Sequence, residues 1–200
     1  MLYLSTVEST TLELLKRLQQ LPVLSNTRLV GGTALALQLG HRKSIDLDFF
    51  GQINVNSQEL REALQTLGML TVLSDSKNIH IYVLNGVKID IVNYTYPWID
   101  DVVCKDGIRL ASPKDIAAMK ITAIEGRGTK KDFVDIYFLL KTYSLNNILD
   151  FYAQKYSDSS SFMAMKSLAY FDDAEEDIMP CMLTDISWEK IKSQILSEIF

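Results

Sequence analysis

Cysteine and histidine are both scarce in this sequence of 200 residues. Cys104 and Cys181 lie far apart and belong to no metal-binding or redox motif, so we expect free thiols in the cytosol, although a disulfide between them stays open. His41 and His80 are isolated and lack the spacing of zinc ligands. No Ser-His-Asp or Cys-His arrangement stands out, so the sequence gives no sign of that kind of nucleophilic catalysis.

Long apolar segments are also absent. No apolar run approaches the ~20 residues that a membrane helix needs, so no membrane partner is expected. The first residues, MLYLSTVEST, lack a basic region and soon turn polar, unlike a secretory signal. Serine-rich low complexity is confined to SDSSS at 157–161. These absences predict a cytoplasmic globular protein.

Charge is unevenly distributed along the chain. The net charge of -5 disfavours indiscriminate binding to nucleic acid. Residues 101–131 nevertheless carry seven Lys/Arg against four Asp/Glu, whereas residues 144–200 carry four against ten. A basic middle and an acidic tail could present one positive face, and solvated helix surfaces explain the same pattern equally well.

Hydropathy patterns divide the chain into a mixed front half and a helical back half. Strands are expected at 27–30, 44–50, 69–73, 79–84, 87–93 and 108–110. Helices are expected at 6–20, 33–39, 57–67, 113–125, 130–143, 145–156, 161–171 and 187–199. The predicted fold class is α+β, with a mixed sheet and flanking helices in residues 1–111 and a helical bundle in residues 112–200.

Two aspartates share one side of an expected strand. Ser44–Phe50 alternates between polar and apolar residues, so Asp46 and Asp48 face the same way. Two neighbouring carboxylates repel each other, and a divalent cation such as Mg²⁺ removes that conflict. The pair therefore indicates a metal site, although D-x-D alone fits a solvated strand face as well.

A glycine turn precedes this strand. Gly31, Gly32 and Thr33 stand between an expected strand and the start of a helix. Glycine allows a close approach of the backbone, and a helix N-terminus offers free N–H groups to an anion, while Thr33 adds a hydroxyl donor. The turn therefore predicts a phosphate site, with tight packing against a sheet as the structural alternative.

A third carboxylate follows the hairpin signal Asn85-Gly86. Asp90 lies with Lys88 on the polar face of the strand VKIDIVNY. If this strand lies beside 44–50, three carboxylates converge and can hold two metal ions, which stabilise the attacking and leaving oxygens of a displacement. Considered alone, Asp90 is an ordinary surface residue of a strand.

Together these motifs resemble a known family. GGTALALQLGHRKSIDLDFF is similar to the glycine turn, short helix and D-x-D strand of the AbiEii/AbiGii toxin family of nucleotidyltransferases. PKDIAAMKITAIEGRGTKKDFVDIYFLL resembles that family's lysine helix followed by R-x(3)-K-D-x-x-D. The likeness spans about residues 27–143, with an echo in SLAYFDDAEED. It implies the nucleotidyltransferase fold.

The resemblance implies a role for each matching residue of the front half. Gly31–Thr33 would hold the triphosphate of a nucleoside triphosphate. Asp46 and Asp48 would bind Mg²⁺ or Mn²⁺, and Asp90 would complete the cluster as a ligand or a base.

Two further matches lie in the back half. Lys120 would contact phosphate, and Asp132 would be the acidic residue after the basic run, supported by Asp135 on the same helical face. Apart from the likeness, Lys120 is a solvated helix residue and Asp132 a favourable residue for the first turn of a helix. The basic run at 127–131, with Lys130 as a surface lysine, is either a solvated connection or a contact for an RNA backbone.

The resemblance implies an enzyme that moves a nucleotide from a nucleoside triphosphate such as ATP or GTP to an acceptor hydroxyl. The acceptor would be a tRNA 3′ end or a protein side chain, and the protein would be the toxin of a toxin–antitoxin or phage-defence pair, with a cognate antitoxin as partner. The alternative is a non-catalytic module that binds a nucleotide or a partner on the same fold. The carboxylates, the glycine turn and Lys120 are all present, which favours the enzyme. The helical part is short compared with that of longer family members.

Overall fold

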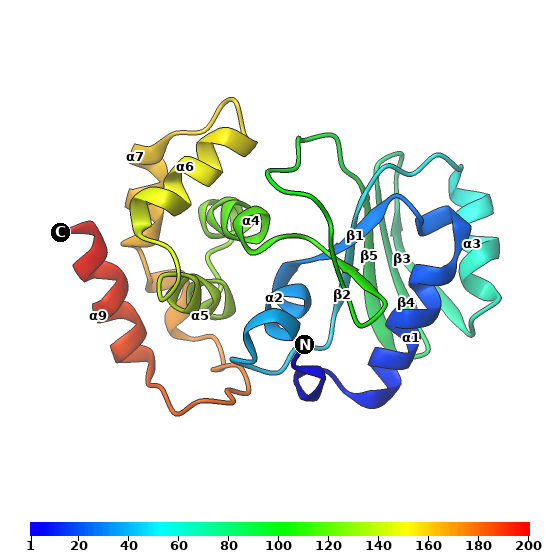
Figure 1. The fold of residues 1–200 in the computed structure, drawn as a ribbon, viewed down its shortest axis with the longest axis horizontal. Coiled ribbons are helices and arrows are strands. Elements are labelled where there is room, and N and C mark those ends of the chain that lie inside the picture. The colour runs from blue at the N-terminus through cyan, green and yellow to red at the C-terminus, as the bar shows by residue number, and fades with distance from the viewer.

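The computed structural model describes residues 1–200, which form one mixed sheet with helices on both faces (Figure 1). The strands are β1 (Thr27–Val30), β2 (Leu47–Gly51), β3 (Leu70–Asp75), β4 (Ile79–Leu84), β5 (Val87–Asn93), β6 (Val103–Lys105) and β7 (Ile108–Leu110). The α-helices are α1 (Ser9–Gln20), α2 (Gly31–Leu39), α3 (Ser57–Gln65), α4 (Pro113–Gly126), α5 (Lys130–Leu139), α6 (Leu145–Lys155), α7 (Ser161–Leu168), α8 (Asp172–Glu175) and α9 (Trp188–Ile199). Two short 3-10 helices, η1 (Leu4–Thr6) and η2 (Pro22–Leu24), flank α1.

The central strand of the sheet is β2. The strand order is β3-β4-β5-β2-β1-β7-β6, and β2 pairs in parallel with β5 and antiparallel with β1. This register places Asp48 of β2 opposite Asp90 on one side and Val30 on the other. Since successive side chains of a strand face opposite ways, Leu47 and Phe49 are fully buried while Asp48 faces the other side of the sheet.

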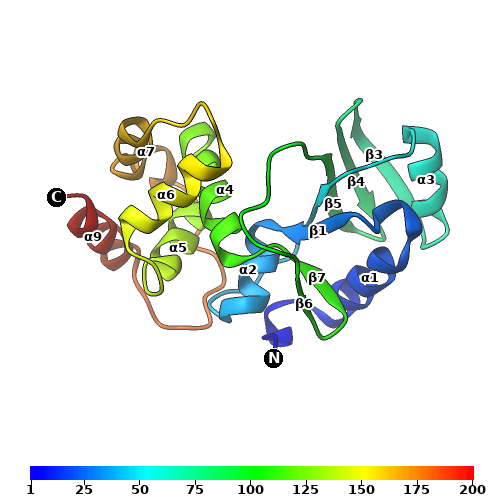
Figure 2. The same ribbon diagram turned by 45° about the horizontal axis from the view of Figure 1, so that its top comes forward.

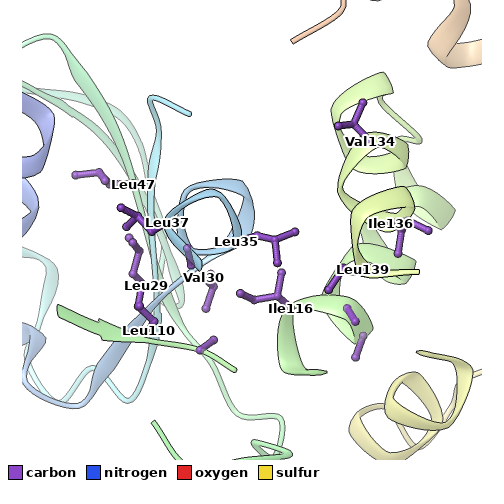
Figure 3. Packing of buried hydrophobic residues seen from close by; sticks show 14 of the residues in the cluster. Leu29, Val30, Leu35, Leu37, Leu47, Leu110, Ile116, Val134, Ile136 and Leu139 are labelled. Atoms are coloured by element: carbon purple, nitrogen blue, oxygen red, sulfur yellow. The ribbon is translucent and has the colours of Figure 1, made fainter. Parts of the chain in front are cut away.

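A single short helix, α2, lies between the sheet and the back half of the chain. Figure 3 shows Leu37 on the sheet side of α2, near Leu29, and Leu35 on the opposite side, towards Ile116 of α4. A helix covered on both sides must be apolar around its whole circumference, and GGTALALQL contains no charged residue. The helix ends before Gly40, whose φ of 70° is the left-handed conformation that favours glycine.

The helices of the back half, α4 to α9, gather on the far side of α2, while α1 and α3 lie against the opposite face of the sheet (Figures 1 and 2). The helix α4 begins at Pro113, and the Ser112 hydroxyl before it accepts a hydrogen bond from the N–H of Asp115. One cluster of 43 buried apolar residues extends through the sheet, α2 and the back half. The predicted division at residue 111 falls between β7 and α4 and stays a prediction, since both parts share this core.

The α+β class predicted from the sequence is confirmed, with a mixed sheet followed by helices. The hairpin turn at Asn85-Gly86 is present, with φ values of 52° and 85°. The sequence patterns missed β6 and α8, which have three and four residues. Such short segments display little periodicity, although the equally short β7 was predicted. None of the helices is long and apolar enough to cross a bilayer.

The strand expected at 44–50 is shorter than predicted. Ser44 and Asp46 precede β2, because the Ser44 N–H donates to the carbonyl of Thr6 instead of to a neighbouring strand. Ile45, which the alternation placed on the buried face, is 64 % exposed. The strand alternation therefore applies to Asp48 but not to Asp46.

Candidate active site

A cleft of about 580 Å³ lies between the sheet and the helices of the back half. Gly31, Asp48 and Asp90 line it from the sheet side, and Lys120 and Arg127 line it from α4 and the residue that follows α4. We call it the main cleft. It brings together the glycine turn, two of the three expected carboxylates and the expected lysine.

The two carboxylates of the main cleft come from adjacent parallel strands. Burial, followed by the negative charges of Asp90 and Asp46, raises the pKa of Asp48 to about 6. Asp90 is paired with Lys88, whose Nζ lies 2.6 and 2.7 Å from the two carboxylate oxygens. Asp48 forms no ion pair with a basic side chain, so a cation bound beside it would relieve the repulsion among the carboxylates.

The glycine turn fits closely around these side chains. Gly31 has a φ of +67°, and a Cβ at this position would lie 2.3 Å from Oδ2 of Asp48. A Cβ at Gly32 would lie 2.1 Å from Nη2 of Arg42. Real Cβ atoms do not approach polar atoms so closely, so both glycines are needed for the backbone to approach a carboxylate and a guanidinium.

Thr33 is placed differently from the expectation. It is only 1 % exposed and lines neither the main cleft nor the basic cavity described below. Its hydroxyl contacts the Asp46 carbonyl and lies 2.8 Å from Oγ of Ser44. The expected phosphate donor is therefore engaged within the protein, where it holds the segment that carries Asp46 against α2.

A second cavity, of about 350 Å³, adjoins the main cleft. Gly31, Asp48, Lys120 and Arg127 line both, so the two cavities meet at Asp48. The main cleft extends from there along Asp90, whereas the second cavity extends along the segment 42–46. Its basic lining residues are Arg42, Lys43, Lys120, Arg127 and Lys131, and its carboxylates are Asp46 and Asp48. We call it the basic cavity.

Lys120 is the centre of a buried ionic network. Its ammonium lies 2.8 Å from Oδ1 of Asp132 and 2.6 Å from Oδ2 of Asp135. Arg42 donates to both oxygens of Asp135 at 2.7 and 2.9 Å, and Nε2 of His41 lies 2.8 Å from Oδ1 of the same carboxylate. The network joins the segment after α2 to α4 and α5, and so determines the shape of the basic cavity.

In this network the ion pairs affect the pKa values of Lys120 and Asp135 more strongly than burial does. Burial by itself would lower the pKa of Lys120, but Asp135 and Asp132 raise it above its ordinary value. Burial would raise the pKa of Asp135, but Lys120 and Arg42 hold it well below its ordinary value. Lys120 and Asp135 are therefore both charged near neutral pH.

In this structure the Lys120 ammonium contacts two carboxylates, whereas the resemblance implied a contact with phosphate. Two carboxylates already match the charge of Lys120, so its direct contact with phosphate stays a prediction. Asp132 is fully buried and lines neither cavity, so the catalytic role expected for it stays a prediction. It accepts hydrogen bonds from Nε of Arg127 at 3.0 Å and from the Thr129 hydroxyl. Arg127, with a side chain that is 58 % exposed, is the cation that this arrangement presents to both cavities.

The expected cluster of three carboxylates is not assembled in this structure. No group of three Asp, Glu, His or Cys side chains converges closely enough to hold one metal ion. Asp46 lines the basic cavity, Asp90 lines the main cleft and Asp48 lines both. The physical reason is that Asp46 precedes β2, so the strand alternation that aligns Asp48 with Asp90 does not include it.

Lys130 is not the surface lysine that the sequence indicated. It is 7 % exposed, and its ammonium donates to the carbonyls of Glu175 and Asp177 at 3.0 and 2.6 Å. It also lies over the ring of Trp188, 5.1 Å from the centroid. Lys130 therefore connects α5 to the C-terminal segments, while Lys131 reaches the basic cavity.

Sequence patterns did not identify the aromatic part of the main cleft. Beyond Asp90, this part is lined by Phe50, Tyr94, Tyr96, Tyr152 and Tyr156. The hydroxyls of Tyr94 and Tyr156 are 2.9 Å apart, which joins the end of β5 to the end of α6. The run NYTYPW directly after the strand of Asp90 is the signal that could have revealed it.

The sequence profile of the family described as "Nucleotidyl transferase AbiEii toxin, Type IV TA system" matches residues 13–105 and 82–198. The chain belongs to this family. It is therefore a nucleotidyltransferase, and the family resemblance expected from the motifs is confirmed.

Individual proteins resemble this chain in sequence or in fold. An uncharacterized protein of Aquifex aeolicus (strain VF5) is 34 % identical over 188 residues, which are 90 % of this chain and 89 % of that protein. The crystal structure of JHP933 from Helicobacter pylori shares the fold with a TM-score of 0.61 and 21 % identity, over 96 % of this chain and 91 % of that one. The nucleotidyltransferase toxin MenT4 from Mycobacterium tuberculosis matches with a TM-score of 0.50 and 14 % identity, over 96 % and 85 %.

Proposed function

We propose that this protein transfers a nucleotide from a nucleoside triphosphate to an acceptor hydroxyl in a reaction that depends on a divalent metal ion. The observation that carries the proposal is the pairing of Asp48 with Asp90 across adjacent strands, beside the glycine turn and at the junction of the two cavities. In this reaction a hydroxyl oxygen forms a bond to the α-phosphorus, and the bond from that phosphorus to the bridging oxygen breaks. Pyrophosphate leaves.

The chemistry of the donor set supports a divalent ion. Asp48 and Asp90 supply hard carboxylate oxygens, which Mg²⁺ and Mn²⁺ prefer, and Asp48 has no basic partner of its own. Gly31 leaves the space in front of Oδ2 of Asp48 open, where any Cβ would intrude. When bound, such an ion neutralises phosphate charge and the charge that develops on the leaving pyrophosphate. In this proposal Asp46 would offer its carboxylate to the ion from the basic cavity, on the side where the triphosphate binds.

The basic cavity is suited to the triphosphate. Asp132, Asp135 and Asp46 balance three of its five basic charges, so a net positive charge faces Asp48 from this side. Arg127 and Lys131 present exposed donors, and the N-terminus of α2 at Gly31 adds backbone N–H groups. Lys120 keeps this wall in place through the buried network.

In this proposal Asp90 acts on the acceptor. It lines the main cleft next to Asp48 but not the basic cavity, so it is open to an acceptor hydroxyl that approaches from the main cleft. Asp90 then orients that hydroxyl and accepts its proton as the new bond forms. Lys88 holds the carboxylate in place from the same strand.

A label-transfer experiment tests this proposal. The protein is incubated with each of four α-³²P-labelled nucleoside triphosphates, Mg²⁺ and total RNA, and label that becomes attached to RNA or protein is separated on gels. We expect metal-dependent labelling that Asp48→Asn abolishes and that the exposed α6 variant Asp150→Asn retains. Binding of nucleotide without any transfer would instead support a non-catalytic binding module.

The family description also bears on the biological partner. Membership of a type IV toxin–antitoxin family supports a toxin role with a cognate antitoxin protein. Growth arrest on expression of the chain, lost with Asp48→Asn, would support the toxin role. Unchanged growth arrest with the variant would show that toxicity, if present, does not depend on nucleotide transfer.

A further inference from the structure

We infer that Lys130 is a positioning residue for the triphosphate, because it holds a C-terminal segment against the basic cavity. The segment, residues 177–183, lies between α8 and α9, and we call it the C-terminal strap. Its residues Pro180 and Cys181 line the basic cavity. The inference rests on the proposed function, which assigns the triphosphate to this cavity, and it gives a role to a residue that the proposal leaves unused.

One end of the strap is joined to the segment that follows α2. The N–H of Lys43 donates to the carbonyl of Cys181 at 2.8 Å, and the N–H of Leu183 donates to the carbonyl of His41 at 2.9 Å. These two bonds form an antiparallel bridge. Figure 1 shows the same contact, where the orange segment before α9 reaches the light-blue end of α2. The bridge places the strap beside residues 42–46, which line the basic cavity.

The other end of the strap is held by Lys130. Its buried ammonium donates to the carbonyl of Asp177 at 2.6 Å and to the carbonyl of Glu175, the last residue of α8, at 3.0 Å. Its backbone N–H donates to Oδ2 of Asp177 at 2.9 Å. Hydrogen bonds with a charged donor are stronger than neutral ones, and burial strengthens them further. One residue at the start of α5 therefore fixes the beginning of the strap.

Between these two ends the strap has few contacts of its own. Ile178 is 93 % exposed, and Met179 is only partly buried. The bridge is the only regular pairing of the backbone in this segment. The position of the strap therefore depends on its two ends, and Lys130 supplies the charged contact at one of them.

The strap lies where the cavity presents its basic residues. Arg42 and Lys43 belong to the segment with which the strap pairs, and Lys131 directly follows Lys130. The N–H of Cys181 donates to no backbone carbonyl, so it is available to a phosphate oxygen. Without the strap, water would reach this side of the cavity, where it would weaken the attraction between basic side chains and phosphate. The strap should therefore strengthen the binding of phosphates whatever base the nucleotide carries.

A purely structural role for Lys130 is the alternative, since its ammonium also lies over the ring of Trp188 in α9. Lys192 provides the matched comparison. Its ammonium lies 2.6 Å from Oε1 of Glu175 and 5.7 Å from the centroid of the same ring, but it forms no hydrogen bond or ion pair with the strap. Loss of Lys192 therefore perturbs α8 and α9 and leaves the strap attached.

The test measures the binding of inorganic tripolyphosphate with Mg²⁺ to the full chain by isothermal titration calorimetry. Tripolyphosphate has no base or ribose, so it reports on the phosphate site alone. We expect Lys130→Met to weaken this binding by about 10-fold, which corresponds to a strap that is bound to residues 41–43 in roughly one molecule in ten. Lys192→Met should bind tripolyphosphate like the wild type.

Hydrogen exchange of the Leu183 amide measures the attachment of the strap directly. In Lys130→Met this amide should exchange faster than in the wild type, while the amide of Ile91 in β5 stays protected and shows that the protein is folded. In the wild type, tripolyphosphate with Mg²⁺ should slow exchange at Leu183, because a ligand that binds only the attached form stabilises it. This last measurement needs no substitution, so it decides the question even if Lys130→Met does not fold.

Nucleotide transfer provides a further readout. Lys130→Met should raise KM for the triphosphate and leave kcat nearly unchanged, since at saturating triphosphate the reaction proceeds from molecules with the strap attached. A lower kcat with an unchanged KM would overturn the inference.

The remaining outcomes separate this inference from the proposed function. Two results overturn the inference alone: unchanged tripolyphosphate affinity in Lys130→Met although Leu183 exchanges faster, or exchange at Leu183 in the wild type that tripolyphosphate does not affect. An equal loss of affinity in Lys192→Met would also overturn it, because the effect would then come from the stability of the C-terminal helices. A wild type that binds neither tripolyphosphate nor nucleoside triphosphate would contradict the proposed function and the inference together.

Discussion

Asp48 and Asp90 are direct register partners on the parallel strands β2 and β5, although α3, β3 and β4 separate them in the sequence. Both face the main cleft, where Asp48 has no basic partner and Asp90 is paired with Lys88. This pair, in which only Asp90 has a basic partner, lies between the basic cavity and the aromatic part of the cleft. Its position is the reason why the proposal assigns the triphosphate to one side and the acceptor to the other.

The raised pKa of Asp48 predicts a stability effect that depends on pH. Its pKa is about 6 in the folded protein, against an ordinary value of 3.8, so the folded state binds this proton more tightly than the unfolded state. Ionisation of Asp48 therefore destabilises the folded protein, and the loss develops as pH rises from about 4 to above 6. Asp48→Asn should raise the melting temperature in metal-free buffer at pH 8 and by less at pH 4.5. An equal gain in melting temperature at both pH values would show that ionisation of Asp48 is not the cause. The exposed variant Asp150→Asn is the control.

Gly31→Ala should disrupt the site without unfolding the protein. The new Cβ would lie 2.3 Å from Oδ2 of Asp48 and would need a φ of +67°, so the carboxylate has to move. We expect the stabilisation of the wild type by triphosphate and Mg²⁺ in thermal shift measurements to be lost in this variant. Gly107→Ala is the matched control, because Gly107 has a φ of +76° but no atom within 4 Å of an added Cβ. If both variants respond to the ligand like the wild type, Gly31 does not shape the site.

Lys120→Met should act mainly on stability. It removes the ammonium that lies between Asp132 and Asp135, and loss of one partner from a buried ion pair typically costs about 3–5 kcal/mol of the free energy of unfolding. Urea unfolding measures this loss, with exposed Lys190→Met of α9 as control. The double variant with Asp132→Asn should lose less than the sum of the single variants, since it removes a charge that Lys120→Met leaves unpaired. A loss below 1 kcal/mol would show that the network contributes little.

Arg127→Ala should act mainly on catalysis. The side chain of Arg127 is 58 % exposed and lines both the main cleft and the basic cavity, so its loss creates no internal space. Loss of one preorganised charge-stabilising donor lowers the rate by about 10²-fold or more, and we expect nucleotide transfer to fall by this factor at saturating triphosphate. Arg17→Ala, on the exposed side of α1, should transfer at the wild-type rate. Full activity of Arg127→Ala would return Lys120 to the role of phosphate ligand.

Local sequence patterns were sufficient for the main elements of this fold. Alternation and turn residues predicted β1 at its observed bounds and β5 beside the Asn85-Gly86 hairpin, and the helix expected from residue 113 begins there as α4. These predictions succeed because turn, cap and strand preferences depend on a residue and its few nearest neighbours in the chain. Those neighbours can be read directly from the sequence.

The same patterns misplaced residues whose surroundings come from distant segments. Asp46 left the expected strand because the backbone beside it bonds to the segment near the N-terminus. Lys130, expected at the surface, and Lys120, expected to contact phosphate, are both buried. Their partners come from α5 for Lys120 and from α8 and the residues after it for Lys130. In each case the partner lies too far along the chain for a helical or strand period to indicate it.

What the residues alone establish here is the family, the order of elements and the set of chemically capable side chains. Tertiary structure decided which of them act together: the parallel pairing of β2 with β5 aligned Asp48 with Asp90, and the packing of α4 and α5 on α2 enclosed Lys120 between two carboxylates. The physical reason is that register and burial depend on contacts between segments remote in sequence, whereas periodicity records only which way each side chain faces on its own element.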